Sequence, residues 1–436
     1  MNALTGTVSA FCRREGIVLQ GKTVLTALSG GRDSMALLCA LMELGTEEGF
    51  SVAAAHYNHH LRKTAQRDEK FVRAFCAGRG IPLVVGGGDV AAFAREMGMS
   101  TEEAARTLRY RFLEEAAEQM GADFIATAHH EQDNAETILM NLLRGTGLRG
   151  LGGIPPVRGR IIRPLLAVSR REINNYIEQN TLPYVEDETN AQTVYTRNRL
   201  RKELLPLLDV LFPGSVERIA LAASRFRQDE DYLEQQAERL LPPAGADGET
   251  WISGETLNRT HPAVSARLLR LAARRLGTEL TAAQVESVLS LRHGVAVLSK
   301  GVRAARDSAG LRFYRIPPPP LPLLLHEGEQ DWGEYRVTVR VTDGEAEENE
   351  NTIVLRTGLP SLTIAPWDGT GRLAVENGRR TVKRLLTDRG IGPAKQENRP
   401  AVFAGDTLAA VFGAGTSREF AAEEQKKLVI TLVRRG

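Results

Sequence analysis

The chain has 436 residues, a length that favours two or three domains, each able to bury a core of its own. Hydrophobic residues at 42% and charged residues at 25% exclude a fibrous or wholly disordered chain. The formal net charge of +2 gives no reason by itself to expect a nucleic-acid partner. Neither a secretion signal nor a run of about 18 apolar residues is present, so the sequence predicts a cytoplasmic protein without membrane contact.

The first part of the chain, residues 1–213, alternates short apolar segments with helical patterns. This alternation predicts an α/β domain with a doubly wound parallel sheet. Ligands of such sheets bind beyond the carboxyl ends of the strands. The predicted strands are Thr23–Leu28, Ser51–His56, Ile81–Val85 and Asp123–Ala128.

A Gly-rich segment, Ser-Gly-Gly-Arg-Asp-Ser at Ser29–Ser34, follows the first predicted strand and precedes a predicted helix over Met35–Leu44. Such a turn predicts a phosphate site, because glycines allow close backbone approach and the helix start carries partial positive charge. It has neither the Walker A nor the dinucleotide-binding pattern. A tight turn capped by Asp33 or Ser34 is the plain alternative. The expected ATP-binding residues in this loop are Ser29, Gly30, Gly31, Arg32, Asp33 and Ser34, with Asp33 also as the Mg²⁺ ligand.

Several further motifs are predicted to lie at the same edge of the sheet. They are His56–Arg62, Glu102–Tyr110 with Arg106 and Arg109 on one helical face, Thr127–Thr137 with His129, Asp133 and Glu136, Leu143–Leu151, Glu186–Asn190, and Thr196–Arg201 with Arg197 and Arg201 four apart. The histidines His56, His59 and His60 fit a metal cluster less well than a loop that contacts adenosine or RNA. Asp133 and Glu136 also fit a solvated acidic pair at a helix start.

Residues 214–322 have mainly helical spacing and end in a Pro-rich linker that includes Pro317–Pro320, which indicates a small helical domain. Residues 323–436 are predicted to form a C-terminal α+β domain. A basic helix is expected there over Arg379–Arg389, with Arg380, Lys383 and Arg384 as candidate RNA contacts. A second basic zone, residues 144–202, carries a local excess of six positive charges.

The loop resembles the SGGxDS loop of the N-type ATP pyrophosphatases, a family that adenylates its substrates and releases pyrophosphate. In combination with the other motifs, and with Val382–Pro393, it resembles the tRNA(Ile)-lysidine synthetase family. Two residues depart from that family's pattern, since Gln132 replaces an aspartate and Asn134 a glutamine. Residues 394–399 also lack the family's basic and aromatic pattern, which puts the transfer of tRNA-stem contacts in question.

The resemblance implies a two-step reaction. ATP adenylates the wobble cytidine of an isoleucine tRNA with a CAU anticodon, and L-lysine then replaces AMP at C2 of that base. It further implies ATP and Mg²⁺ as cofactors, Arg109 or Arg106 as the arginine on the α-phosphate, and His129 at the phosphate or the base. Asp133 and Glu136 would hold the lysine amine, and a homodimer is suggested. Arg197 and Arg201 would clamp phosphate or the lysine carboxylate, or simply form a charged helix face.

Two other functions fit parts of the sequence. The chain could be a related amidotransferase or thiolase, but no glutaminase domain is evident and Cys12, Cys39 and Cys76 are far apart, without a CxxC pair. Cys39 is predicted to be a core residue. The chain could also be a binding module without catalytic activity, in which Asp33, Asp133 and Glu136 would be dispensable.

Overall fold

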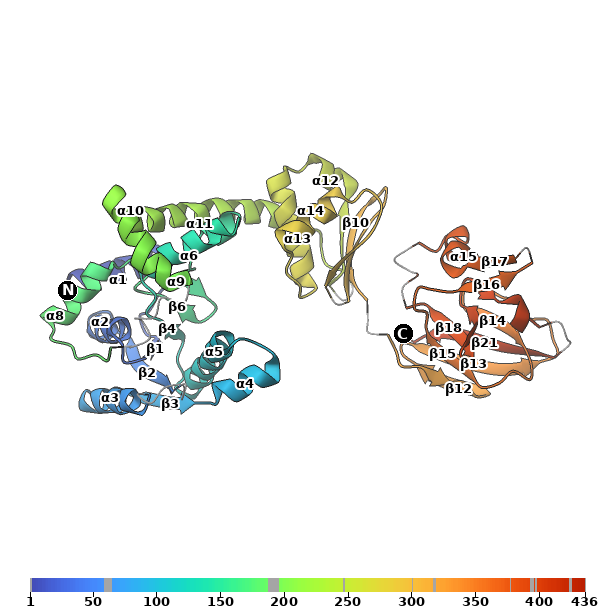
Figure 1. Ribbon diagram of the computed structural model, residues 1–436, viewed down its shortest axis with the longest axis horizontal. Helices are drawn as coiled ribbons and strands as arrows, with labels where there is room; N and C mark the ends of the chain where they lie inside the picture. Colours follow the sequence, from blue (N-terminus) through green and yellow to red (C-terminus); the bar gives the residue numbers. More distant parts are fainter. Residues whose placement is uncertain are drawn as a thin grey trace. The chain divides into compact units, whose positions relative to one another are not determined.

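The computed structural model describes residues 2–58, 65–186, 196–245, 248–299, 301–316, 319–376, 378–392, 396, 398–422 and 426–435 (Figure 1). The chain divides into two compact units, residues 1–232 and 233–436. The division falls inside one long helix, α11 (Ser215–Leu240). The predicted division into three domains, at residues 213 and 322, stays a prediction.

The first unit is built on a six-stranded sheet. Its elements are α1 (Ala3–Arg14), β1 (Thr23–Ala27), α2 (Arg32–Glu48), β2 (Ser51–Asn58), α3 (Ala65–Gly78), β3 (Leu83–Gly87), α4 (Val90–Met97), α5 (Thr101–Gln119), β4 (Phe124–Ala126), α6 (Glu131–Leu143), α7 (Leu148–Leu151), β5 (Val157–Arg158), β6 (Ile161–Ile162), α8 (Arg170–Gln179), α9 (Thr196–Arg199), the π-helix η2 (Leu200–Leu204) and α10 (Leu205–Leu211).

The strand order is β3-β2-β1-β4-β6-β5, and all neighbours pair in parallel except β5, which runs antiparallel to β6 at the edge. Alternate strand residues face two separate cores. Val24 and Ala54 pack with α1, α2, α3 and α8, whereas Leu25 and Ala55 pack with α5 on the opposite face. Helices on both faces of a parallel sheet confirm the predicted doubly wound fold.

The four predicted strands are confirmed. Strand β2 continues two residues past His56 to Asn58, and β3 begins and ends two residues later than the predicted Ile81–Val85. Because β1 and β4 are neighbours, the segments that follow them lie side by side. This is the point where the chain switches from one side of β1 to the other, and it is the usual ligand site of such sheets.

The second unit begins with mixed helices and strands. After the end of α11 it contains β7 (Thr250–Ser253), α12 (Gly254–Arg259), α13 (Pro262–Arg275), α14 (Ala282–Ser290), β8 (Gly294–Ser299), β9 (Val302–Arg306) and β10 (Gly310–Arg315). The helices were expected, but the antiparallel sheet β7-β10-β9-β8 was not. The amphipathic faces of α13 and α14 need an apolar partner, and this sheet supplies it through Ile252, Ala304 and Phe313.

The C-terminal part of the second unit has a core of its own between two sheets, β11-β15-β18-β19-β20 and β12-β13-β21-β14. Its elements are β11 (Leu323–Leu324), β12 (Gly328–Trp332), β13 (Tyr335–Thr342), β14 (Thr352–Arg356), β15 (Leu362–Pro366), β16 (Arg372–Val375), β17 (Gly378–Thr381), α15 (Val382–Asp388), β18 (Pro400–Ala404), β19 (Thr407–Val411), β20 (Gly415–Thr416), the 3-10 turn η5 (Arg418–Phe420) and β21 (Lys427–Arg434).

The predicted basic helix over Arg379–Arg389 was too long. Gly378 has a φ of +103° and starts the strand β17, which places Arg379 and Arg380 in a hairpin with β16. The helix α15 starts only after its N-cap residue Thr381.

Some predicted features lie outside the described residues, namely His59 to Arg62, Asp187 to Asn190, Pro317, Pro318 and Pro393. Among the described parts of the chain, no helix is long and apolar enough to cross a bilayer. The three cysteines are buried and unpaired. Burial raises the pKa of Cys12 to about 12 and those of Cys39 and Cys76 to about 11, which suits core residues and not thiolate chemistry.

Candidate active site

The Gly-rich loop joins β1 to α2. Gly30 has a φ of +87°, in the left-handed region, and a Cβ there would lie 3.2 Å from Val72 Cγ2. Gly31 is the extended N-cap residue of α2, and no side chain caps this helix start. The first N–H groups of α2 have no partner within the helix. The loop therefore presents main-chain donors of the kind that bind phosphate.

The two loop serines hold this turn in shape. Ser29 Oγ and Ser34 Oγ lie 3.0 Å apart, and Gly31 N donates to Ser29 Oγ at 3.2 Å. The buried Ser34 hydroxyl also donates to the carbonyl of Gly31 at 2.9 Å. These hydrogen bonds fix the shape of the turn between β1 and α2.

The side chain of Arg32, which is predicted to bind ATP, contacts α8 and the segment after it. Its guanidinium donates to Asn174 Oδ1 at 3.0 Å and to the Tyr184 hydroxyl at 2.7 Å, and it stacks over the Tyr184 ring at 4.7 Å. These contacts attach α2 to α8 and to the segment after it. The side chain of Arg32 thus holds these elements together, whereas its main-chain N–H belongs to the first turn of α2.

The segment after β4 brings a second set of groups to the loop. His130 is the N-cap residue of α6, and its N–H donates to Asp133 Oδ2 at 3.1 Å in a capping box. Its ring is 1% exposed, with Nε2 3.7 Å from Asp33 Oδ2 and 3.5 Å from Asp133 Oδ2. The carboxylates of Asp33 and Asp133 therefore meet on one histidine.

Asp133 and Glu136 form the most deeply buried acidic pair of the site, with side chains 14% and 0% exposed. Arg201 donates from Nε to Glu136 Oε1 at 2.6 Å and from Nη2 to Asp133 Oδ1 at 2.8 Å. Arg197 donates from Nε to Glu136 Oε2 at 2.7 Å. Burial and ion pairs with two arginines exclude a solvated acidic pair, and both arginines face these carboxylates instead of forming a charged surface.

The charged groups shift one another's pKa values. Burial alone would raise the pKa of Asp133, but His130, Arg197 and Arg201, together with the His130 N–H, hold it below its ordinary value. Burial lowers the pKa of His129 to about 4, opposed by Asp133 and reinforced by Arg163 and Arg109. At neutral pH the carboxylate of Asp133 is therefore ionised and the imidazole of His129 is neutral.

A group of arginines lies beside His129. Arg109 is half-buried, and its cation is one of those that lower the pKa of His129, which places it close to the strand end. Arg106 is exposed and stacks over the Tyr110 ring at 4.9 Å. Arg109 also lies over the Tyr110 ring, at 5.4 Å, and the roles of both arginines at the phosphate stay predictions.

Three residues near the site had no predicted role there. Arg170 joins Asp33 to His130, Arg163 is 3% exposed beside Tyr110, and Asn134 accepts from Ile154 N at 2.8 Å. The sequence Ser169–Glu172 does carry a capping-box pattern, which would have placed Arg170 at a helix start. Asn134 departs from the resembling family's glutamine, and its amide here supports the turn at Gly153.

The donor groups present suit Mg²⁺ held jointly with a substrate. Within the described part of the chain, no three His, Cys, Asp or Glu side chains form a metal cluster. Asp33 offers one carboxylate at the loop, with Oδ1 bound to Arg170 and Oδ2 facing His130. Mg²⁺ commonly uses one or two carboxylates together with substrate phosphates, so this set fits the ion.

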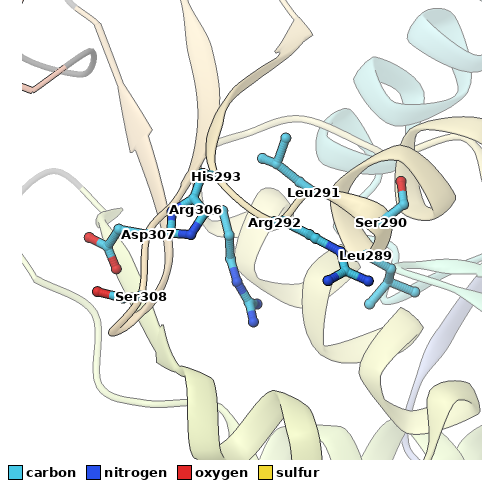
Figure 2. Close-up of a pocket in the computed structure, with 8 residues that line it drawn as sticks. All are labelled: Leu289, Ser290, Leu291, Arg292, His293, Arg306, Asp307 and Ser308. Carbon is cyan, nitrogen blue, oxygen red and sulfur yellow. The ribbon is translucent and has the colours of Figure 1, made fainter.

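An open depression of about 550 Å³ lies in the second unit, far in sequence from the loop residues. Figure 2 shows Arg292 and Arg306 both extending into it, with His293 and Asp307 at its side.

The predicted RNA contacts of the C-terminal part lie on β17 and α15. Arg380 lies on β17 with its guanidinium 3.7 Å from Asp388, and Lys383 and Arg384 are exposed on α15. A group of basic side chains of this kind suits a polyanion.

A parallel sheet with a Gly-rich phosphate loop after its first strand, and a second acidic motif after the neighbouring strand, define a PP-loop ATP pyrophosphatase. The model of the PP-loop domain matches residues 7–208, and that of the TilS substrate C-terminal domain matches residues 362–432. A tRNA(Ile)-lysidine synthase from Bacteroides thetaiotaomicron is 32% identical over 438 residues, covering 97% of this chain and 98% of that one. The chain belongs to the tRNA(Ile)-lysidine synthase family.

Two other proteins match about half of the chain. A tRNA(Ile)-lysidine synthase from Bacillus subtilis is 40% identical over 233 residues, covering 52% of this chain and 49% of that one. The solved structure of the U34-tRNA thiolase NcsA from Methanococcus maripaludis with its [4Fe-4S] cluster is 20% identical. It covers 51% of this chain and 77% of its own, with a TM-score of 0.44.

Proposed function

We propose that this protein ligates L-lysine to C2 of the wobble cytidine in the isoleucine tRNA with a CAU anticodon. ATP is converted to AMP and pyrophosphate through an adenylated cytidine, and codon reading changes from AUG to AUA. The observation that carries the proposal is the meeting of the loop carboxylate Asp33 with Asp133 around His130. Family membership supports the same reaction.

The first half of the reaction belongs to the loop. Attack of the cytosine O2 on the α-phosphate of ATP places negative charge on phosphoryl oxygens, and donors fixed beforehand stabilise that charge. The N–H groups of Gly30 and of the first turn of α2 supply such donors, and Arg109 supplies a cation. Asp33 would hold Mg²⁺, which neutralises the charge of the triphosphate when bound.

His129 completes this half as a neutral group. Its Nδ1 lies 3.0 Å from Thr127 Oγ1, which fixes the ring at the end of β4. A neutral imidazole can donate one hydrogen bond from its other nitrogen, to the α-phosphate or to the base, without bringing a full charge to the crowded arginine group.

The second half belongs to the acidic pair. The lysine ε-ammonium must lose a proton before its nitrogen attacks C2 and AMP leaves, so it needs a nearby carboxylate. Asp133 retains some exposed surface, whereas Glu136 has none. Asp133 is therefore the carboxylate that a lysine can reach first, and Glu136 becomes accessible only if Arg197 or Arg201 moves. Either arginine, once freed, could bind the lysine carboxylate.

The basic residues of the second unit are the proposed tRNA contacts. Arg380, Lys383 and Arg384 are assigned to the phosphate backbone, together with Arg292 and Arg306 at the depression in Figure 2. Phosphate contacts give affinity and register without reading bases. A homodimer and a cytoplasmic location remain predictions.

The test is AMP production from ATP by the purified protein with lysine and one of two tRNAs, both with CAU anticodons, one for isoleucine and one for methionine. We expect AMP to form only with lysine and the isoleucine tRNA, with lysine attached to its wobble cytidine. Product with sulfur or ammonia as the donor would favour a thiolase or amidotransferase. Tight tRNA binding without any AMP would favour a binding module.

A further inference from the structure

Arg170 occupies a rigid position between the two halves of the site. It is the first residue of α8, and the N-cap residue Ser169 forms a capping box with Glu172, with Ser169 N donating to Glu172 Oε2 at 2.9 Å. Just before it, the carbonyl of Val168 accepts from Glu131 N at 3.1 Å. The backbone at Arg170 is therefore tied to the start of α6, the helix that carries Asp133 and Glu136.

The guanidinium of Arg170 contacts both halves at once. Its Nη1 forms an ion pair with Asp33 Oδ1, and its Nη2 lies 2.6 Å from His130 Nε2. His130 in turn contacts Asp133 through its main-chain N–H. A continuous path of polar contacts thus runs from the carboxylate of the phosphate loop to the carboxylate of the lysine half.

Only an arginine can make both contacts from this position. Its planar fork presents two donors in a fixed geometry, whereas a lysine is a single point charge on a flexible stem. Asp33 is 31% exposed, and in the described residues no other side chain is recorded in hydrogen-bond contact with its carboxylate. Without Arg170 this carboxylate would lose the ion pair that fixes its direction and the positive charge that offsets its repulsion of an incoming triphosphate.

We propose that Arg170 is a positioning residue that orients Asp33 toward Mg²⁺ and ATP and links this orientation to His130 and Asp133. The inference rests on the proposed function, since it assigns Asp33 to the ATP half. The competing interpretation is that Arg170 only anchors α8 to the rest of the first unit. In that case its loss would lower stability and leave the Mg²⁺ requirement unchanged.

The test measures equilibrium binding of ATP to the full-length protein across a series of Mg²⁺ concentrations, together with thermal unfolding. For Arg170→Ala we expect the Mg²⁺ concentration for half-maximal ATP binding to rise about tenfold or more, as for the loss of a charge-assisted hydrogen bond. Arg171→Ala is the matched control, because Arg171 is the next residue of α8 and is exposed. It should bind ATP like the unmodified protein.

A second variant, Arg170→Lys, separates the contact with Asp33 from the contact with His130. It also keeps the test decisive if the alanine variant misfolds. We expect it to recover part of the Mg²⁺-dependent ATP binding, while lysine ligation stays low relative to pyrophosphate release because the link to His130 is lost. The proposal is overturned if both Arg170 variants bind ATP with the Mg²⁺ dependence of Arg171→Ala. If the unmodified protein binds ATP and Mg²⁺ but never ligates lysine, the proposed function fails while the assignment of Arg170 to Asp33 can still be judged.

Discussion

Arg201 and Glu136 form a two-point ion pair, with Nε 2.6 Å from Oε1 and Nη2 3.1 Å from Oε2, around a carboxylate that has no exposed surface. The same pair connects the π-helix η2, which contains Arg201, to α6. Burial lowers the pKa of Arg201, but the carboxylates of Glu136 and Asp133 raise it by more. The guanidinium therefore stays charged. A buried carboxylate of this kind depends on its partners, because an ion left alone in the interior is costly.

Arg201→Ala should destabilise the first unit by about 3 kcal/mol, the lower end for breaking a buried pair, because Arg197 still contacts Glu136. Chemical denaturation, followed by far-UV circular dichroism, measures the change in the free energy of unfolding. Arg199→Ala is the matched control, since Arg199 is exposed and pairs only at the surface with Glu203 at 3.2 Å. It should cost less than about 0.5 kcal/mol. Equal effects of the two variants would contradict the structural role of the buried pair.

Asn134→Ala should lower stability by about 1–3 kcal/mol, because Ile154 N would lose its acceptor. Asn134→Gln should be no better tolerated. Asn134 is 2% exposed, and a Cβ at Gly153 would approach its Oδ1 to 2.2 Å, so there is no space for another methylene group. Gln132→Ala, at a half-buried neighbouring position, is the control and should be nearly neutral. A stabilising Asn134→Gln would show that this turn can repack.

His129→Asn should weaken the acid sensitivity of the protein. Since the pKa of His129 in the folded state is about 4, against 6.5 ordinarily, the unfolded chain binds the extra proton between these pH values. The free energy of unfolding therefore falls as pH is lowered from about 6.5 to 4, by about 1–3 kcal/mol from this residue. Denaturation at several pH values would show a shallower decline in His129→Asn than in His326→Asn, a substitution at an exposed histidine. Parallel curves would refute this assignment.

Lys383→Ala and Arg384→Ala should each weaken tRNA binding and reduce the slope of log affinity against log salt concentration by about one. Binding of ATP should be unchanged, because neither residue lies in the first unit. The control is Arg259→Ala, at an exposed arginine already paired with Glu255 at 2.8 Å. If salt dependence is the same in all three variants, α15 makes no contact with tRNA phosphates.

The phosphate loop and the sheet were predictable from sequence because both rest on local patterns. Short apolar strands, each followed by helical spacing, fix the order of elements, and Gly30 with Gly31 marks the turn. The acidic pair was predictable as residues but not as a buried cluster. The partners Arg197 and Arg201 are about sixty residues away in the chain, and only the tertiary fold brings them to α6.

Arg170 and the sheet β7-β10-β9-β8 were missed for different reasons. An arginine at the first position of a capped helix has many uses, and its contact with Asp33 spans 137 residues of sequence. The four strands are short and follow helices with stronger periodicity, so their pattern was not recognised. The predicted helix over Arg379–Arg389 was too long because basic residues fit a β-hairpin as well as a helix. The positive φ of Gly378 favours the hairpin at Arg379 and Arg380.

The central claim is that Asp33 serves the ATP half and Asp133 the lysine half of one site, and a single paired measurement tests it. Pyrophosphate release and lysine attachment to the isoleucine tRNA are followed together in Asp33→Asn and Asp133→Asn. We expect Asp33→Asn to lose both, and Asp133→Asn to release pyrophosphate while lysine attachment is lost. Loss of only lysine attachment in Asp33→Asn, or full lysine attachment in Asp133→Asn, would contradict the account.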